Sequence, residues 1–198
     1  MIRKLLIANR GEIAVRIIRA CREMGIEAVA VYSEADKDSL HTQLADEAIC
    51  IGPGASAKSY LNMESIISAA LISGADAIHP GFGFLSENAR FAQICEQCGI
   101  TFVGPTSQVI QNLGNKQVAR NTMEAAGVPV IPGTKEAILD VKTGAKEARK
   151  IGYPVIIKAA LGGGGKGMRT AFSPNEFEKA FLTAQKEARI AFGDGTMY

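Results

Sequence analysis

Short apolar segments alternate with amphipathic segments of helical length along the first hundred residues of this 198-residue chain. Strands are predicted at 5–8, 27–32, 47–51, 75–79 and 101–103, with helices between them. This alternation is typical of β-α-β units, whose strands lie side by side in a parallel sheet. We therefore expect an α/β fold that is built on a parallel sheet.

Three stretches that follow predicted strands, at 9–12, 79–88 and 104–106, are candidates for a binding site. Ligands of parallel sheets gather beyond the carboxyl ends of the strands. His79 has the chemistry of a general base, although a histidine with a structural role is the favoured interpretation. Glu87, in a loop at the sheet edge, is the better candidate for a contact with a ligand.

The first predicted helix follows the stretch at 9–14 and ends at Gly25. Its core-facing stripe is predicted to consist of Ile13, Ile17, Cys21 and Met24. Its other face carries three charged residues, Arg16, Arg19 and Glu23. Glu12 and Arg16 stand four residues apart, as do Arg19 and Glu23, and this is the spacing of ion pairs on a solvated helix face.

Glycine occupies five of the six positions from 162 to 167, and only Lys166 interrupts the run. Because glycine loses more backbone entropy on folding than other residues, such a run indicates backbone that approaches a ligand closely. Inward-pointing N–H groups suit phosphate oxygens. Lys158 and Lys166 add positive charge. The run is therefore predicted to hold phosphate.

The segments around the glycine run predict a hairpin. One strand is predicted at 154–158 and another at 168–172, and the next helix starts only at Ser173. Ser173, Pro174 and Glu176 form the pattern of a capping box there. A dinucleotide-binding G-x-G-x-x-G loop opens directly onto a helix, so the match of this pattern at 162, 164 and 167 is weak.

Other glycine-rich segments fit less well. A Walker A loop requires glycine where Ala160 stands and serine or threonine where Gly167 stands. The glycine hairpin of protein kinases has its phosphate-binding lysine on a later strand, whereas Lys158 precedes this run. Flexible linkers are not framed by a buried strand and a capped helix.

The pattern changes after residue 114. A helix that carries Lys116 is predicted at 115–126, and an extended hinge follows at 127–133. Beyond the hinge, helices are predicted at 141–150 and 174–192, on either side of the hairpin, and a strand begins at 196–198. We therefore divide the chain into an N-terminal domain at 1–114, a linker helix and hinge at 115–133, and a small domain at 134–198.

Composition excludes several classes of function. A net charge of +2 gives no basis for binding nucleic acid or an acidic membrane. No apolar run is long enough to span a membrane and no leader peptide precedes the first strand, so a cytoplasmic protein is expected. Cys95 and Cys98 form a C-x-x-C pair, but they share an apolar helical face with Phe91 and Ile94. A core role is therefore favoured over a metal or redox role.

Together these motifs resemble biotin carboxylase, the ATP-grasp component of biotin-dependent carboxylases. The resemblance extends in order over nearly the whole chain, through the stretches at 7–14, 79–88, 114–116, 152–158 and 159–168. It implies an N-terminal preATP-grasp domain with a Rossmann-like sheet. The small glycine-lid part of an ATP-grasp domain would follow.

The resemblance also implies roles for individual residues. Contacts with ATP are implied for Lys116, Lys158, Gly163, Gly164, Gly165, Lys166 and Met168. Candidate contacts on the biotin and bicarbonate side are His79, Phe82, Gly83 and Glu87. The helix that carries Arg16, Arg19 and Glu23 lies at the dimer interface in the family, and we prefer this interpretation to a solvated face.

The sequence departs from the family in one residue and in length. The family usually has tyrosine where this chain has Phe82, so a hydroxyl contact is lost there. Its metal-binding glutamates and its arginines for bicarbonate and biotin are expected beyond residue 198. No catalytic or metal-binding residue is therefore assigned here, and the chain alone is expected not to turn over ATP.

The implied reaction has two steps. ATP, with Mg²⁺ or Mn²⁺, phosphorylates bicarbonate, and the resulting carboxyphosphate gives CO₂ to biotin on a carrier protein. The implied partners are biotin carboxyl carrier protein, carboxyltransferase subunits and a second copy of the chain, as in bacterial acetyl-CoA carboxylase, which serves fatty acid synthesis.

Three alternatives stay open. The chain can belong to a pyruvate, propionyl-CoA or other acyl-CoA carboxylase. It can belong to another ATP-grasp ligase such as a carbamoyl-phosphate synthetase, although the pairing of the stretches at 9–14 and 79–88 argues against this. It can also be a nucleotide-binding or dimerisation module without catalysis.

Overall fold

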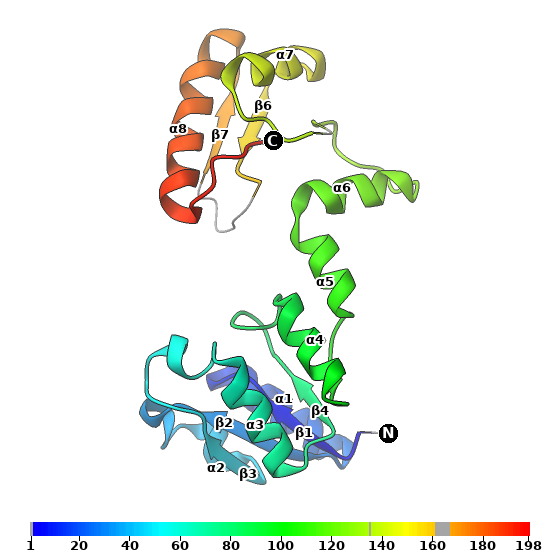
Figure 1. The fold of residues 1–198 in the computed structure, drawn as a ribbon, viewed down its shortest axis with the longest axis vertical. Coiled ribbons are helices and arrows are strands. Elements are labelled where there is room, and N and C mark those ends of the chain that lie inside the picture. Colours follow the sequence, from blue (N-terminus) through cyan, green and yellow to red (C-terminus); the bar gives the residue numbers. More distant parts are fainter. Residues whose placement is uncertain (1, 135, 161–166) are drawn as a thin grey trace. The chain divides into compact units, whose positions relative to one another are not determined.

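The computed structural model describes residues 2–134, 136–160 and 167–198, and of Lys116 and Gln117 it describes the backbone alone. The chain forms two compact units, Met1–Gln111 and Asn112–Tyr198 (Figure 1). Each unit has a sheet and a hydrophobic core of its own.

The first unit contains a five-stranded parallel sheet, which confirms the predicted α/β class. Its strands are β1 (Lys4–Ile7), β2 (Glu27–Tyr32), β3 (Glu47–Cys50), β4 (Ala77–His79) and β5 (Thr101–Phe102). They lie in the order β3-β2-β1-β4-β5. β2 and β3 lie on one side of β1, and β4 and β5 lie on its other side. The carboxyl ends of β1 and β4 therefore form a topological switch point, where open parallel sheets bind ligands.

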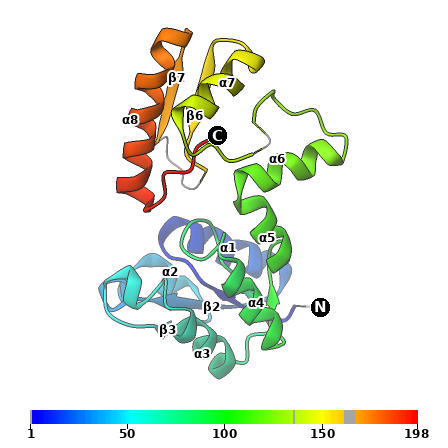
Figure 2. The same ribbon diagram turned by 45° about the horizontal axis from the view of Figure 1, so that its top comes forward.

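Helices cover both faces of this sheet (Figure 2). They are α1 (Gly11–Met24), α2 (Leu40–Leu44), α3 (Met63–Ser73) and α4 (Ala89–Gln97), and α5 (Ser107–Gly114) follows β5. Leu5 and Ile7 of β1 pack with α1 on one face. Leu6 packs with α3 and α4 on the other face. Alternate residues of β1 thus serve two cores, because successive side chains of a strand point to opposite faces.

The core-facing stripe predicted for α1 is wrong by about one residue. The buried residues are Ala14, Val15, Ile18 and Cys21. Met24 is 73% exposed, and Ile13 and Ile17 are half-buried. The helix carries two neighbouring apolar stripes, and periodicity alone does not decide which of them faces the sheet. Small Ala14 and Cys21 let the helix approach the sheet, so that stripe is the buried one.

The charged side of α1 lies in solvent within its unit. Arg16, Arg19 and Glu23 are all exposed. Within the described part of the chain, no ion pair joins Glu12 to Arg16 or Arg19 to Glu23. Gly25 ends the helix with a φ of 69°, as predicted.

Helix α4 contains Cys95, and Cys98 is its C-cap residue. Cys95 is fully buried beside Phe91, whereas Cys98 is exposed, so the prediction of a shared apolar face is wrong for Cys98. All four cysteines are free thiols. Among the described residues, no three His, Cys, Asp or Glu side chains are grouped to hold a metal ion. No described helix is long and apolar enough to cross a bilayer.

The second unit is a hairpin packed on helices. Its elements are α6 (Lys116–Ala125), α7 (Val141–Ile151), β6 (Val155–Lys158), β7 (Met168–Ala171) and α8 (Pro174–Phe192). β6 and β7 are antiparallel, and their last pair joins Lys158 to Met168. The predicted strand–glycine run–strand order is therefore confirmed. Tyr198 also pairs with β6, since its N–H donates to Lys158 O at 2.8 Å and its carbonyl accepts from Lys158 N at 2.9 Å.

α8 begins where it was predicted but without the predicted capping box. Ser173 is the N-cap residue, yet its hydroxyl makes no capping hydrogen bond. The carboxylate of Glu176 accepts from the N–H of Phe172 at 3.1 Å and not from that of Ser173. The carboxylate thus binds the chain one residue earlier, where β7 ends.

Candidate functional site

The side chain of Asn9 connects the two strand ends at the switch point. Asn9 follows β1, and its Nδ2 donates to Pro80 O and to Phe82 O, each at 2.8 Å. Its Oδ1 accepts from the N–H of Arg10 at 2.9 Å. Asn9 is only 4% exposed. Its bond to Pro80 O is buried and the other two bonds are partly buried, so competition from water is limited. The loop after β4 is therefore held against the loop after β1.

Glycine is required where this loop passes Asn9. Gly81 has a φ of +66°, and a Cβ atom there would lie 2.6 Å from Asn9 Nδ2. Gly83 also has a positive φ, of +68°. These two glycines let the backbone turn sharply enough to offer two carbonyls to one amide.

His79 is held by the same turn. Its Nδ1 accepts from the N–H of Gly81 at 3.0 Å, so a proton on the neutral ring is on Nε2. Burial lowers the pKa of His79. The chain's other histidine, His41, has a lowered pKa for the same reason, and its Nε2 lies 3.3 Å from Val31 O. Both rings are therefore neutral at pH 7.

The remaining residues predicted for the biotin and bicarbonate side lie on the surface. Phe82 is 73% exposed, and Gly83 and Glu87 are exposed. His79 and Phe82 line, together with Ile17 of α1, a hollow of about 480 Å³ that is almost wholly apolar. The structure thus brings His79 and Phe82 to one hollow, which Gly83 and Glu87 do not line.

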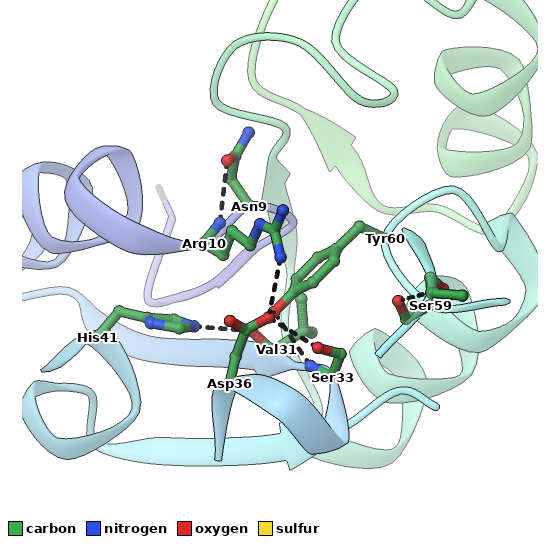
Figure 3. Close-up of polar contacts among 9 residues, drawn as sticks. Asn9, Arg10, Val31, Ser33, Asp36, His41, Ser59 and Tyr60 are labelled. Atoms are coloured by element: carbon green, nitrogen blue, oxygen red, sulfur yellow. Dashed lines mark hydrogen bonds and ion pairs between the residues drawn. The ribbon is translucent and has the colours of Figure 1, made fainter. Parts of the chain in front are cut away.

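Sequence reasoning missed a cluster around Arg10 (Figure 3). The Arg10 guanidinium lies 5.2 Å from the ring centroid of Tyr60 and 5.5 Å from that of Phe84. It forms an ion pair of 3.3 Å with Asp36. The same carboxylate oxygen accepts from the hydroxyls of Ser33 and Tyr60, each at 2.7 Å.

The electrostatics of this cluster stabilise the charged form of Asp36. Burial by itself raises the pKa of Asp36, but hydrogen bonds from Ser33, Tyr60 and Arg10 hold it below its ordinary value. Burial, together with the Asp36 carboxylate, raises the pKa of Tyr60 to about 12. Tyr60 therefore stays a neutral donor to Asp36. The one sequence signal of this cluster was the place of Arg10 in the stretch at 9–12, which follows the first predicted strand.

In the second unit the structure brings Lys158 and Met168 together. They are cross-strand partners at the end of the β6–β7 hairpin that adjoins the glycine-rich segment. Val155 and Ile157 point into the core, so Lys158 lies on the other face of the hairpin with Ile156, which is 54% exposed. Met168 is 41% exposed. This face thus offers a cation next to an accessible apolar side chain.

The other residues predicted to contact ATP lie outside what the structure describes. They are Gly163, Gly164, Gly165, Lys166 and the side chain of Lys116. The backbone of Lys116 begins α6.

Comparison with known proteins identifies both units. The family model "Biotin carboxylase, N-terminal domain" matches residues 1–110. The model "Carbamoyl-phosphate synthase L chain, ATP binding domain" matches residues 115–198. Among curated proteins, Biotin carboxylase 1 of Bacillus subtilis is 60% identical over 198 residues, which are all of this chain and 44% of the relative.

Solved structures agree with this family. The biotin carboxylase of Campylobacter jejuni, in a complex with β,γ-ATP, has a TM-score of 0.93 and 52% identity, and the match covers 100% of this chain and 44% of that one. The biotin carboxylase domain dimer of Hydrogenobacter thermophilus 2-oxoglutarate carboxylase, in complex with MgADP, ADP and bicarbonate, has a TM-score of 0.90 and 47% identity. That match covers 100% of this chain and 43% of that one. The present chain thus spans less than half the length of these proteins.

Replacing Asn9 with aspartate tests the link between the strand ends. In Asn9→Asp the buried carboxylate cannot donate to the two carbonyls and is repelled by them. We expect a loss of about 3 kcal/mol of unfolding free energy at pH 7, measured by urea denaturation. The matched control is Asn62→Asp, since the Asn62 side chain only accepts, from Ser65 N at 3.1 Å. The control should change stability by less than about 0.5 kcal/mol, and equal losses in the two variants would contradict this role of Asn9.

Proposed function

The chain belongs to the biotin carboxylase family, and we propose that the protein that contains it carboxylates biotin on a carrier protein, using ATP and bicarbonate. The observation that carries this proposal is the β6–β7 hairpin. It places Lys158 and Met168 side by side at the two ends of the glycine-rich segment. The bound nucleotides of the Campylobacter jejuni and Hydrogenobacter thermophilus proteins support the assignment to ATP.

The role proposed for the second unit is to bind and orient ATP. The ammonium group of Lys158 is a compact charge that suits phosphate oxygens. The thioether of Met168, on the same end of the hairpin, suits the apolar face of the adenine ring. Lys116, Gly163, Gly164, Gly165 and Lys166 are proposed to complete these contacts. Catalysis of phosphoryl transfer consists mainly of such positioning and charge neutralisation.

The γ-phosphoryl group of ATP is proposed to pass to bicarbonate with release of ADP. The carboxyphosphate formed then gives CO₂ to a ureido nitrogen of biotin, with release of phosphate and of the proton of that nitrogen. Mg²⁺ or Mn²⁺ would neutralise phosphate charge when bound. The described residues do not supply a site for that ion, since they contain no cluster of three candidate ligands. We therefore assign no step of the reaction to metal ligands in this chain.

The loop after β4 is proposed to contribute to the biotin and bicarbonate side. Phe82 offers an exposed ring, and the neutral His79 keeps only its Nε2–H free to donate, because Gly81 occupies Nδ1. His79 is therefore proposed as a positioning donor and not as a general base. Gly83 and Glu87 are the further candidates in this loop.

For the final acceptor we propose acetyl-CoA, so that the protein works with carboxyltransferase subunits in the cytoplasm and initiates fatty acid synthesis. The second candidate is a keto-acid or other acyl-CoA carboxylase. The similarity to a 2-oxoglutarate carboxylase supports this second candidate. The two candidates differ in the final acceptor. In the first, the carboxylated carrier passes its carboxyl group to acetyl-CoA, and in the second it passes it to a keto acid or another acyl-CoA.

We also propose a homodimer that uses the exposed side of α1. Arg16, Arg19 and Glu23 are exposed there, and the half-buried Ile13 and Ile17 lie next to them. An arrangement of charges around apolar side chains is typical of a protein interface. The dimer of the Hydrogenobacter thermophilus domain supports this proposal.

Lys158→Gln tests the ATP site in the full-length enzyme. ADP release by the unsubstituted enzyme should depend on bicarbonate, and the variant should show a KM for ATP raised by at least about tenfold, because a charged phosphate contact is lost. Lys179→Gln, an exposed lysine of α8, is the matched control. An unchanged KM in Lys158→Gln would exclude the phosphate contact. ATP binding without any bicarbonate-dependent ADP release would favour a non-catalytic nucleotide-binding module.

Arg19→Glu tests the dimer. Reversing this charge should weaken self-association by about tenfold or more, because like charges would meet at the interface. Sedimentation velocity over a concentration series measures the effect. Arg90→Glu is the control, since Arg90 is exposed on α4, which covers the opposite face of the sheet. An Arg19→Glu protein that sediments like the unsubstituted dimer would exclude this surface.

A further inference from the structure

The backbone at Gly167 leaves the β6–β7 ladder and turns toward α8. Gly167 O still accepts from Ala159 N at 2.9 Å, which continues the ladder one step beyond the pair of Lys158 and Met168. Its N–H does not return to β6. It donates instead to Oε2 of Glu187, at 3.3 Å. A side chain of α8 thus binds Gly167, the residue just before β7, where the backbone turns away from β6.

Packing leaves little room for a side chain at Gly167. Gly167 is buried and has a φ of +66°. A Cβ atom there would lie 3.1 Å from Ala159 Cβ and 3.2 Å from Ala188 Cβ. The backbone therefore packs directly on the small side chains of β6 and α8. A buried N–H in this position needs a partner, because leaving it unpaired costs more than the bond itself contributes.

Glu187 is the partner and binds a second group as well. Its other carboxylate oxygen pairs with the guanidinium of Arg169 on β7. Both side chains of that ion pair are more than a third exposed, so the pair itself contributes little to stability. Its effect is to orient the carboxylate, so that the second oxygen faces the Gly167 N–H.

The chain just before residue 161 is also fixed by a backbone bond. Ala160 N donates to Thr196 O at 2.8 Å. The ends that flank residues 161–166 are therefore held by different elements, Ala160 by the extended C-terminal residues and Gly167 by α8. Glu187 is the side chain that makes the second of these links.

We propose that Glu187 is a positioning residue for ATP binding: by holding the Gly167 amide, it fixes Met168 beside Lys158. This inference rests on the proposed function, because it takes these two residues to contact ATP. Glu187 itself contacts no substrate in this account. A residue that only orders binding groups should affect ATP in the ground state and in the transition state equally. Its loss should therefore raise KM and leave kcat nearly unchanged.

Two substitutions separate the hydrogen bond from the packing. Glu187→Met keeps the length and helix propensity of the side chain but removes both acceptors. Glu187→Gln keeps one acceptor for the Gly167 N–H and removes the charge. In the full-length enzyme we expect Glu187→Met to raise the KM for ATP by about tenfold, with kcat within about twofold. Glu187→Gln should restore the KM to within about threefold of the unsubstituted enzyme.

The control is Glu178→Met, an exposed position on the same helix, which should leave both constants unchanged. Thermal unfolding of each variant shows whether it folds. If Glu187→Met does not fold, amide hydrogen exchange takes the place of the kinetic comparison. Gly167 should then exchange slowly in the unsubstituted enzyme and in Glu187→Gln, and rapid exchange in the unsubstituted enzyme would contradict the proposal.

Two results would overturn this role of Glu187. One is a folded Glu187→Met enzyme with an unchanged KM for ATP. The other is a Glu187→Gln enzyme as impaired as Glu187→Met, which would mean that the charge and not the amide bond matters. Either result would leave the proposed function intact, provided that the unsubstituted enzyme releases ADP in response to bicarbonate. If the unsubstituted enzyme does not release ADP in response to bicarbonate, the proposed function is wrong, and the inference about Glu187 loses its basis.

Discussion

The first unit depends on the buried amide of Asn9. β1 and β4 are adjacent in the sheet but distant in sequence, and the bond from Asn9 to Pro80 joins residues that are 71 positions apart. One side chain binds the carbonyls of both Pro80 and Phe82, and the bond to Pro80 is buried, where an unpaired carbonyl is costly. It thereby sets where His79 and Phe82 lie. The site at the switch point is thus positioned by a structural hydrogen bond and not by the residues that are proposed to meet substrate.

The second unit uses the same device. At Gly167, as at Gly81, a glycine with positive φ turns the backbone at a strand end, and a polar side chain of a neighbouring segment binds the backbone group that the turn leaves outside the ladder. At Gly81 the side chain is a donor, because the turn presents carbonyls. At Gly167 it is an acceptor, because the turn presents an N–H. In both places glycine supplies the conformation and the neighbouring side chain fixes it.

Much of the fold was predictable from the sequence, because strands, helix ends and the hairpin follow from local patterns. The strand at 27–32 and the helix at 174–192 have the predicted bounds, and Gly25 ends its helix as expected. What failed depended on tertiary contacts. The buried stripe of α1 was set by close packing of Ala14 on the sheet. The contacts of Glu187 with Gly167 and of Asp36 with Tyr60 join residues that are distant in sequence, so no local spacing encodes them.

The protein that contains this chain is proposed to carboxylate biotin, and this activity can be measured on the carrier protein itself. The most direct measurement supplies the full-length protein with ATP, Mg²⁺, ¹⁴C-bicarbonate and biotinylated carrier protein, and then isolates the carrier. We predict acid-labile ¹⁴C on the carrier that requires both ATP and biotin. Hydrolysis of ATP with no label on the carrier, under conditions in which a known biotin carboxylase labels it, would contradict the account.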